Sequence, residues 1–501
     1  MAFLYLGSLS GPGAFPAWTG EGNQNSAEYG SSVATAGDLN GDGYSDIIIG
    51  APRYTNGQDR EGAVYVYFGT STGLNPSPIV IEPDRIALLG YRVSTAGDVN
   101  GDGYSDVIVG APGYSNGESW EGAVYLFYGT ASGINTVPLI FSETNQNMVY
   151  YGTMVSTAGD INGDGYSDII VGVPGYSNPE LDEGVAFVYY GSAAGLNTTP
   201  LLLEADQAEA FFGISVGTAG DVNGDGYADV IIGARDYDNP EVDEGRVYVY
   251  FGSASGLSTT TNWTAESNQE GGSFGHSVAT AGDVNGDGYS DIIIGATTYL
   301  NPSDKGAAFV YHGGPSGPGA TAGWSGYGGN SYDEFGHSVS SAGDVNGDGF
   351  ADSLVGVPGF SNDSGAAFLF MGAAGGLETT SSWSAIGESE GSKFGCSVSM
   401  AGDVNGDGYG DVIVGASDQN WGQGKAFLFL GSASGLSASP SWTVVGDNAG
   451  DMVGASVAAA GDVDGDGYAD FLVGASGFYN FTGKVYLYLG GASGPSVSPD
   501  W

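Results

Sequence analysis

Acidic side chains recur at alternate positions of one short segment, first met at residues 38–46 as Asp-Leu-Asn-Gly-Asp-Gly-Tyr-Ser-Asp. Numbered from Asp38, this loop has side-chain oxygens at positions 1, 3, 5 and 9 and the backbone carbonyl of Tyr44 at position 7. Oxygen donors in this pattern suit a hard divalent cation, and carboxylates without His or Cys favour calcium over zinc. Magnesium fits less well because it keeps more of its water. The segment therefore predicts a calcium site.

The same segment occurs eight times, and every copy keeps Asp at positions 1, 5 and 9. The predicted calcium ligands, copy by copy, are Asp38, Asn40, Asp42, Tyr44 and Asp46; Asp98, Asn100, Asp102, Tyr104 and Asp106; Asp160, Asn162, Asp164, Tyr166 and Asp168; Asp221, Asn223, Asp225, Tyr227 and Asp229; Asp283, Asn285, Asp287, Tyr289 and Asp291; Asp344, Asn346, Asp348, Phe350 and Asp352; Asp403, Asn405, Asp407, Tyr409 and Asp411; and Asp462, Asp464, Asp466, Tyr468 and Asp470. A single copy could be an Asx-rich turn without metal, but eight copies argue against that alternative. About eight calcium ions are expected.

Position 12 distinguishes this loop from an EF-hand. That motif has a bidentate Glu there and helices on both sides, whereas this chain has Ile49 and strand-forming neighbours. Asp46 is therefore the candidate bidentate ligand. Gly41 and Gly43 allow the backbone to wrap closely around an ion.

The loops lie 59 to 62 residues apart, and a period this regular indicates a repeat architecture rather than three or four unrelated domains. In the first repeat, β-branched and aromatic runs at residues 29–37, 44–52, 62–69 and 79–81 are bounded by Gly, Pro and Asn. No stretch has helical periodicity. In several repeats the fourth strand is expected to end in Trp, at Trp263, Trp324, Trp383 and Trp442.

Four short strands per repeat predict an all-β fold. We expect residues 1–501 to form a single eight-bladed β-propeller of four-stranded antiparallel blades, with the calcium loop between strands 1 and 2 of each blade. An open stack of sheets has the same period, but a closed ring leaves only short strand edges and is favoured.

The two ends of the chain carry one hairpin more than eight blades require. Residues 2–18 match strands three and four of a blade, and so do residues 485–501. We expect residues 1–18 to be a closing segment that supplies at least the outer strand of the last blade. The alternative is that the chain was cut from a longer array.

Composition and charge restrict the classes of partner. The chain is 41% hydrophobic with a net charge of −48, and 25 of its 58 acidic residues belong to the loops. Only 10 Lys and Arg are available to meet phosphates, which argues against nucleic acid. No apolar run is long enough to insert into a membrane, and the single cysteine, Cys396, excludes an internal disulfide. The start of the chain does not read as a signal peptide, although weak calcium loops would be filled only in extracellular fluid, so we expect a secreted or cell-surface protein.

Two further motifs recur with the acidic loop. Phe-Gly occurs at Phe212-Gly213, Phe274-Gly275, Phe335-Gly336 and Phe394-Gly395, and Gly-Ala-Pro at Gly50-Ala51-Pro52 and Gly110-Ala111-Pro112. Together with the loop, they resemble the FG-GAP repeat of the integrin α-subunit β-propeller. The resemblance implies calcium between the first two strands of a blade and a role in extracellular adhesion or ligand recognition. Integrin propellers have seven blades with calcium loops in only some, so the resemblance is closer to a bacterial FG-GAP protein or a recently amplified array.

The face opposite the calcium loops is the expected binding face for a protein or glycan. It carries the two-to-three loops, which vary most between repeats, and function is commonly carried on loops held by a rigid scaffold. Trp120 and Trp421 in these loops are the candidate contact residues, although each could instead pack over the edge of its own blade.

Catalysis is not expected. His276 and His337 occupy one repeated slot that holds Cys396 in another repeat, and His312 replaces an aromatic residue at the end of strand three. These residues indicate interchangeable structural positions, with neither a triad nor a phosphate-binding glycine motif. The alternatives to a recognition module are a purely structural segment of a larger surface protein and, with less support, a hydrolase or lyase in the central funnel.

Overall fold

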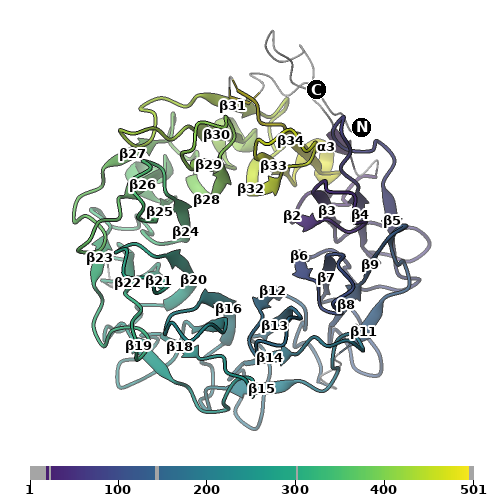
Figure 1. Ribbon diagram of the computed structural model, residues 1–501, viewed down its shortest axis with the longest axis horizontal. Helices are drawn as coiled ribbons and strands as arrows, with labels where there is room; N and C mark the ends of the chain where they lie inside the picture. Colours follow the sequence, from purple (N-terminus) through teal and green to yellow (C-terminus); the bar gives the residue numbers. More distant parts are fainter. Residues whose placement is uncertain (1–18, 22–23, 142–145, 301–302, 493, 496–501) are drawn as a thin grey trace.

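The computed structural model describes residues 19–21, 24–141, 146–300, 303–492 and 494–495. Eight four-stranded antiparallel sheets are arranged radially around a central axis, which confirms the predicted eight-bladed β-propeller (Figure 1). In each blade the first strand lies nearest the axis and the fourth lies outermost.

From inner to outer strand, the blades are β2 (Val33–Gly37), β3 (Asp46–Ala51), β4 (Ala63–Tyr67) and β5 (Ile79–Ile81); β6 (Arg92–Gly97), β7 (Asp106–Ala111), β8 (Ala123–Phe127) and β11 (Leu139–Phe141); β12 (Met154–Gly159), β13 (Asp168–Val173), β14 (Val185–Tyr189) and β15 (Leu201–Glu204); β16 (Phe212–Gly220), β17 (Asp229–Ala234), β18 (Arg246–Tyr250) and β19 (Trp263–Glu266); β20 (Phe274–Gly282), β21 (Asp291–Ala296), β22 (Ala307–Tyr311) and β23 (Trp324–Tyr327); β24 (Ser338–Gly343), β25 (Asp352–Val357), β26 (Ala366–Phe370) and β27 (Trp383–Ile386); β28 (Phe394–Gly402), β29 (Asp411–Ala416), β30 (Lys425–Phe429) and β31 (Trp442–Val445); and β32 (Val453–Gly461), β33 (Asp470–Ala475), β34 (Lys484–Tyr488) and β1 (Thr19–Glu21). A small ribbon of β9 (Gly129–Thr130) and β10 (Gly133–Ile134) forms the three-to-four turn of the second blade.

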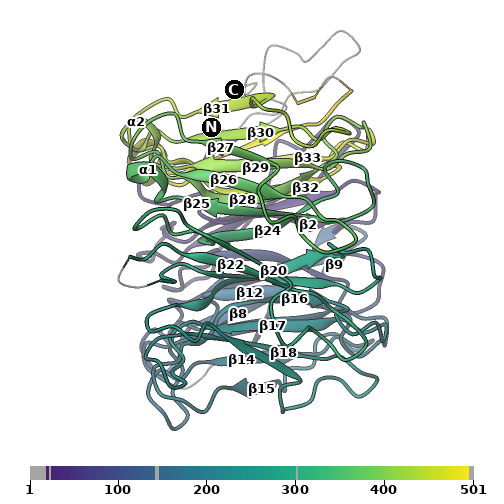
Figure 2. The same ribbon diagram turned by 90° about the vertical axis from the view of Figure 1, so that its left-hand side faces the viewer.

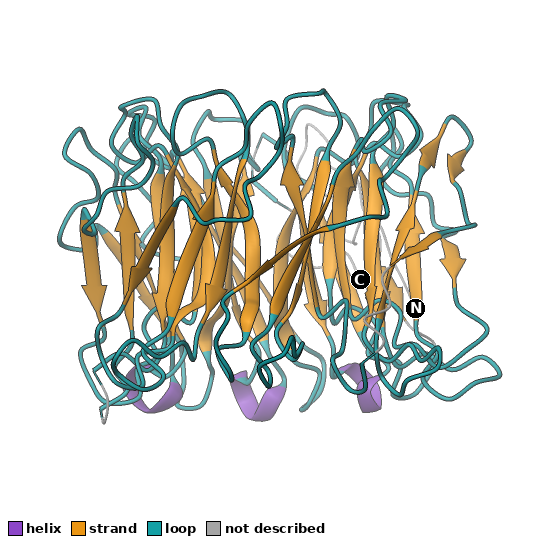
Figure 3. Cartoon of the chain, turned by 90° about the horizontal axis from the view of Figure 1, so that it is seen from below, coloured by secondary structure: helices purple, strands orange, loops and turns teal. Residues whose placement is uncertain are grey.

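The connecting loops gather on two opposite faces of the ring (Figure 2). The acidic loops and the three-to-four turns share one face, because strands one and three both run towards it. The two-to-three and four-to-one loops form the other face. Single-turn helices α1 (Phe360–Asp363), α2 (Gln419–Gly422) and α3 (Phe478–Phe481) lie in two-to-three loops on that second face (Figure 3).

The hydrophobic core lies between neighbouring blades. Strand residues alternate in direction, so Ile47 and Ile49 pack towards the last blade while Ile48 packs towards the second. Both faces of every blade are therefore buried, and the second strands, such as Asp46–Ala51, are buried along their whole length. This double burial explains why the second strand is continuously apolar rather than alternating.

Glycine pairs let adjacent blades approach at the backbone. A side chain on Gly50, from the Gly-Ala-Pro motif, would place its Cβ 1.9 Å from the carbonyl oxygen of Gly90. In the second repeat Leu89-Gly90 stands at the position that Phe-Gly occupies in other repeats. Gly90 in turn donates its N–H to the carbonyl of Gly110 at 3.1 Å. Glycine in these two motifs therefore permits a close contact between blades that a larger residue would prevent.

The tryptophans of the fourth strands begin these strands, and the expectation that they end them is wrong. The indole N–H of Trp324 donates to the carbonyl of Glu378 at 2.9 Å, and that of Trp383 donates to the carbonyl of Ser437 at 2.9 Å. These acceptors lie in the three-to-four turn of the next blade. Only the end of the outer strand near the acidic-loop face can reach them, so Trp must come first.

The last blade is completed by the N-terminal part of the chain. β1 pairs antiparallel with β34, with Thr19 opposite Tyr486 and Glu21 opposite Lys484, and thereby supplies the outer strand. Residues 1–18, the expected closing segment, lie outside the described residues. The structure thus joins the two ends of the chain by strand pairing.

Candidate metal loops and ligand face

The first residue of each acidic loop organises the loop backbone around its carboxylate. Oδ1 of Asp38 accepts the N–H groups of Gly41 at 2.7 Å and Asp42 at 3.1 Å, and Oδ2 accepts that of Gly43 at 2.8 Å. Gly41 and Gly43 have φ of +71° and +89°, which favours glycine. The loop therefore curls around the carboxylate at position 1, as the spacing predicts.

In seven of the loops, the Asn at position 3 forms two hydrogen bonds with the Asp at position 5, one as acceptor and one as donor. In the first loop Asn40 accepts the N–H of Asp42 through Oδ1 at 2.9 Å, and its amide Nδ2 donates to Oδ2 of Asp42 at 2.9 Å. Oδ1 of Asp42 accepts the N–H of Tyr44 at 3.1 Å. These bonds bring the side chains of positions 1, 3 and 5 into one small turn.

The carboxylate at position 9 forms the base of the loop. Asp46 is fully buried; its Oδ2 accepts the N–H of Leu39 at 2.8 Å and its Oδ1 accepts the N–H of Gly69 at 2.7 Å. Burial raises the pKa of Asp46 to about 7, against the lowering effect of the two N–H groups, and the nearby charges of Asp42 and Asp38 raise it further. Each carboxylate oxygen keeps a second lone pair, which is free to bind a cation.

The eight loops are joined head to tail around the ring. The position-8 residue of each loop donates its N–H to the position-1 carbonyl of the preceding loop, as Ser105 does to Asp38 at 2.9 Å. The aromatic residue at position 7 also packs on the position-4 glycine of the preceding loop, because a Cβ on Gly41 would lie 2.6 Å from the ring of Tyr104. The circle closes where Ser45 donates to the carbonyl of Asp462 at 3.0 Å.

Lysine and arginine are absent from the acidic loops, and all ten lie at the opposite face: Arg53, Arg60, Arg85, Arg92, Arg235, Arg246, Lys305, Lys393, Lys425 and Lys484. Several of them pair with acids of that face, such as Arg246 with Glu266 at 2.9 Å and Lys393 with Asp363 at 2.9 Å. Among the described residues, no loop carboxylate forms an ion pair with Lys, Arg or His. Within the described residues, therefore, no Lys or Arg neutralises any of the loop carboxylates, which number 25 in the sequence.

The face opposite the loops carries an aromatic cavity of about 560 Å³ across blades two to four. Trp120 lines it and meets Tyr150 edge to face, with ring centroids 6.0 Å apart. The remaining wall includes Met148, Phe211 and Arg235, whose guanidinium carbon lies 5.7 Å from the centroid of the Phe211 ring. Trp120 is thus brought into a site, whereas Trp421 stands alone in α2 and is 94% exposed.

Sequence comparison of the repeats could have located this cavity. The slot immediately before the Phe-Gly position holds Leu88, Tyr150 and Phe211 in blades two to four. In most other blades the same slot is polar or charged, as at Glu28 and Lys393. Apolar residues at this slot in three consecutive repeats are the sequence signal of the cavity.

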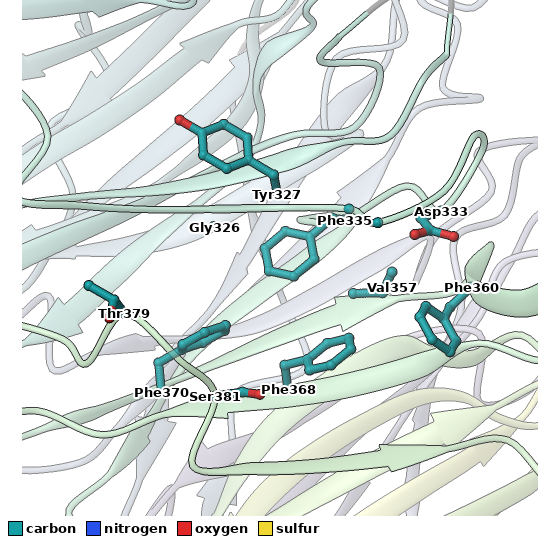
Figure 4. A pocket seen from close by; sticks show the side chains of 12 residues that line it. Gly326, Tyr327, Asp333, Phe335, Val357, Phe360, Phe368, Phe370, Thr379 and Ser381 are labelled. Carbon is teal, nitrogen blue, oxygen red and sulfur yellow. The ribbon is translucent and has the colours of Figure 1, made fainter.

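A second, smaller hollow of about 210 Å³ lies between blades five and six (Figure 4). Its wall is made of the rings of Phe335, Phe360, Phe368 and Phe370, which also take part in packing between the blades. Gly326 opens it, since the corresponding positions of neighbouring fourth strands carry side chains. The hollow is therefore a gap in the packing of the outer strands.

Two of the three histidines come together in the ring. His276 and His337 lie on neighbouring blades with ring centroids 5.5 Å apart, and Nδ1 of His337 lies 3.8 Å from Oε2 of Glu334. No hydroxyl or thiol within the described ranges donates a hydrogen bond to either ring. Cys396 is half-buried, with its Sγ 3.6 Å from Oγ of Ser417, and burial raises the pKa of its thiol. Neither the histidine pair nor Cys396 therefore forms a hydrogen-bonded pair of nucleophile and base within the described residues.

None of the helices in the described part of the chain has the length and hydropathy needed to cross a bilayer.

Comparison with known proteins matches the FG-GAP repeat model at eight places: residues 29–67, 89–127, 152–189, 212–250, 274–311, 335–370, 394–429 and 453–488. Similar proteins include integrin α pat-2 of Caenorhabditis briggsae, 33% identical over 226 residues, covering 42% of this chain and 18% of the relative. Integrin α-5 of Xenopus laevis is 30% identical over 217 residues, covering 41% and 20%, and integrin α-PS2 of Drosophila melanogaster is 31% identical over 313 residues, covering 54% and 21%. The chain thus matches only about a fifth of the length of these relatives. They are animal proteins and do not support the expected similarity to a bacterial protein. The eight matched repeats cover more than half of the chain, which belongs to the FG-GAP repeat family.

Proposed function

We propose that this propeller is a calcium-stabilised recognition module of a secreted or cell-surface protein. Calcium would occupy the eight acidic loops, and a protein or glycan would bind the opposite face. The observation that carries the proposal is the separation of charge: crowded loop carboxylates have no protein cation among their described neighbours, while every Lys and Arg lies on the other face.

The residues present fit a calcium ion. Positions 1, 3, 5 and 9 offer side-chain oxygens and position 7 offers a carbonyl, an all-oxygen set of the kind that calcium prefers. When bound, the ion would supply the positive charge that the loop lacks. The buried Asp at position 9 would then be held ionised, and the loop would be fixed to strands two and three through Asp46 and its seven counterparts.

The comparisons support a role in recognition. The relatives are integrin α-subunits, and the matches cover about half of this chain and about a fifth of the length of each relative. On the face opposite the loops, Tyr91, Met148 and Tyr150 are each more than 40% exposed beside the cavity that Trp120 lines. Exposed aromatic residues around a cavity are typical of a surface that binds a protein or a sugar.

A purely structural repeat segment is the second candidate. The continuous ring of loop contacts and the doubly buried blades would make a stiff spacer with no ligand. The exposed aromatic cavity favours recognition, because a spacer does not need it. An enzyme is not proposed, since no hydroxyl or thiol of the described residues donates a hydrogen bond to the histidine pair.

The first experiment is a count of bound metal together with thermal unfolding in calcium and in excess chelator. At ten times Kd each site adds about 1.4 kcal/mol, so eight independent sites would add about 11 kcal/mol. We expect close to eight ions per chain and a large fall in the unfolding temperature on chelation. Little bound metal and an unchanged transition would overturn the calcium proposal.

The ligand face is tested separately by screening the calcium-loaded protein on a glycan array and against a library of displayed extracellular proteins. Trp120→Ala and Tyr150→Ala should abolish the binding that the screen finds. Val137→Ser is the matched control, since Val137 is 74% exposed but lies in a turn on the calcium-loop face. Loss of binding with the control alone would place the ligand on the wrong face for this proposal.

A further inference from the structure

The eighth acidic loop differs from the other seven at position 3. In the seventh loop, Asn405 donates from its amide to Oδ2 of Asp407 at 2.9 Å, and the first six loops have the same bond. The eighth loop has Asp464 there, and a carboxylate cannot donate this hydrogen bond. Oxygens of Asp462, Asp464 and Asp470 lie within 4.8 Å of one another. It is the only such acidic group in the described part of the chain.

The additional carboxylate stands in the blade that joins the two ends of the chain. The eighth loop connects β32 to β33, and the outer strand of this blade is β1, which pairs with β34 over three residues. In the other seven blades the chain runs directly from the third strand to the fourth. The eighth blade is therefore the one that can lose its outer strand without unfolding a connected hairpin.

The same loop also makes the contact that closes the circle of loops. The carbonyl of Asp462 accepts the N–H of Ser45, and the ring of Tyr44 covers Gly465, whose Cβ would lie 2.6 Å from it. Further from the loop, in the first half of β32, the hydroxyl of Ser456 donates to the carbonyl of Gly30 at 3.3 Å. The first and eighth blades are thus joined through residues more than 400 positions apart in the chain.

We propose that the eighth loop is the tightest calcium site of the ring and that calcium bound there locks the seam between the first and last blades. This inference rests on the proposed calcium function and assigns Asp464 as the residue that sets the difference. One more ligand charge strengthens a calcium loop. Without the ion, the same carboxylates repel one another, so the seam is weakest in the empty protein and strongest in the filled one.

The test uses Asp464→Asn in the full chain, with Asn405→Asp as the matched control that puts the same charge in the seventh loop, which adjoins the sixth and eighth loops rather than the first. Calcium titration calorimetry should find one site about tenfold tighter than the rest, lost in Asp464→Asn. The substitution should raise the unfolding temperature in excess chelator and lower it in calcium. That reversal of sign is not expected of a merely structural residue.

Amide hydrogen exchange locates the effect. Calcium at a concentration that fills only the tight site should slow exchange in Thr19–Glu21 and Lys484–Tyr488 of the wild-type protein but not of Asp464→Asn. In Asn405→Asp a second tight site should appear without further protection of those strands. Calcium binding to eight equal sites, or seam protection unchanged by Asp464→Asn, would overturn this inference and leave the calcium function standing. An absence of calcium binding would overturn both.

Discussion

The stacking of each acidic loop on the next can be tested with two glycines of the second loop. Gly101 and Gly103 both have positive φ, +71° and +89°. A Cβ added to Gly101 would lie 2.3 Å from the ring of Tyr166 in the third loop, whereas one added to Gly103 would meet no atom within 4 Å. The two substitutions to Ala therefore share the backbone cost and differ in the contact between loops.

The backbone cost of an L-residue in this region is about 1–2 kcal/mol for either substitution. Gly101→Ala must also push the ring of Tyr166 away, and overpacking of this kind costs about 1–3 kcal/mol more. We expect the free energy of unfolding, measured by urea denaturation at one fixed calcium concentration, to fall further for Gly101→Ala than for Gly103→Ala by that second amount.

A double-mutant cycle identifies the source of the difference. In a Tyr166→Ala background the ring is gone, so Gly101→Ala should cost no more than Gly103→Ala. Equal destabilisation by the two alanines in the wild-type background would refute the loop-to-loop contact. A difference that persists without the ring of Tyr166 would show that something other than that ring opposes the Cβ.

Two further predictions concern side chains outside the loops. Burial lowers the pKa of His276 to about 4, helped by the charges of His337 and Arg235, and burial also lowers the pKa of His337. The unfolded chain takes up these protons near pH 6.5, so the histidines' contribution to stability is complete above that pH and is lost as the pH falls towards about 4. Urea denaturation from pH 7.5 to 4.5 should show a shallower loss for a variant with His276→Ser and His337→Thr; an unchanged pH profile would contradict this. Trp383→Ala should cost about 3–5 kcal/mol because it removes a ring that is 8% exposed, whereas Trp421→Ala, at 94% exposure, should change stability by less than about 0.5 kcal/mol. A comparable loss from both in the same denaturation assay would contradict the packing described.

Local patterns were sufficient to predict the blade. The eight acidic loops, the apolar second strands and the outer strand at Ile79–Ile81 can be read along the chain because alternation, turn glycines and β-branched runs act over a few residues. Radial closure also followed from the repeat period, since four-stranded units with exposed edges are best protected in a ring. The metal itself stays a prediction from donor chemistry.

The contacts between blades could not be predicted from the sequence. That Tyr104 covers Gly41, that Trp383 reaches Ser437, and that His276 meets His337 depends on the twist and spacing of sheets about 60 residues apart. The error over the tryptophans has the same origin, because the hydrogen bond that puts Trp first in its strand lies in the next blade.

The sequence by itself determined the repeated unit, its oxygen-rich loop and the segregation of apolar and acidic residues within it. Tertiary structure alone decided which copies became neighbours: it drew the apolar slots of blades two to four into one cavity and completed the blade that carries Asp464 with a strand from the other end of the chain. The reason is physical. A unit's internal order depends on nearby residues, whereas the cavity and the seam exist only after the ring has closed.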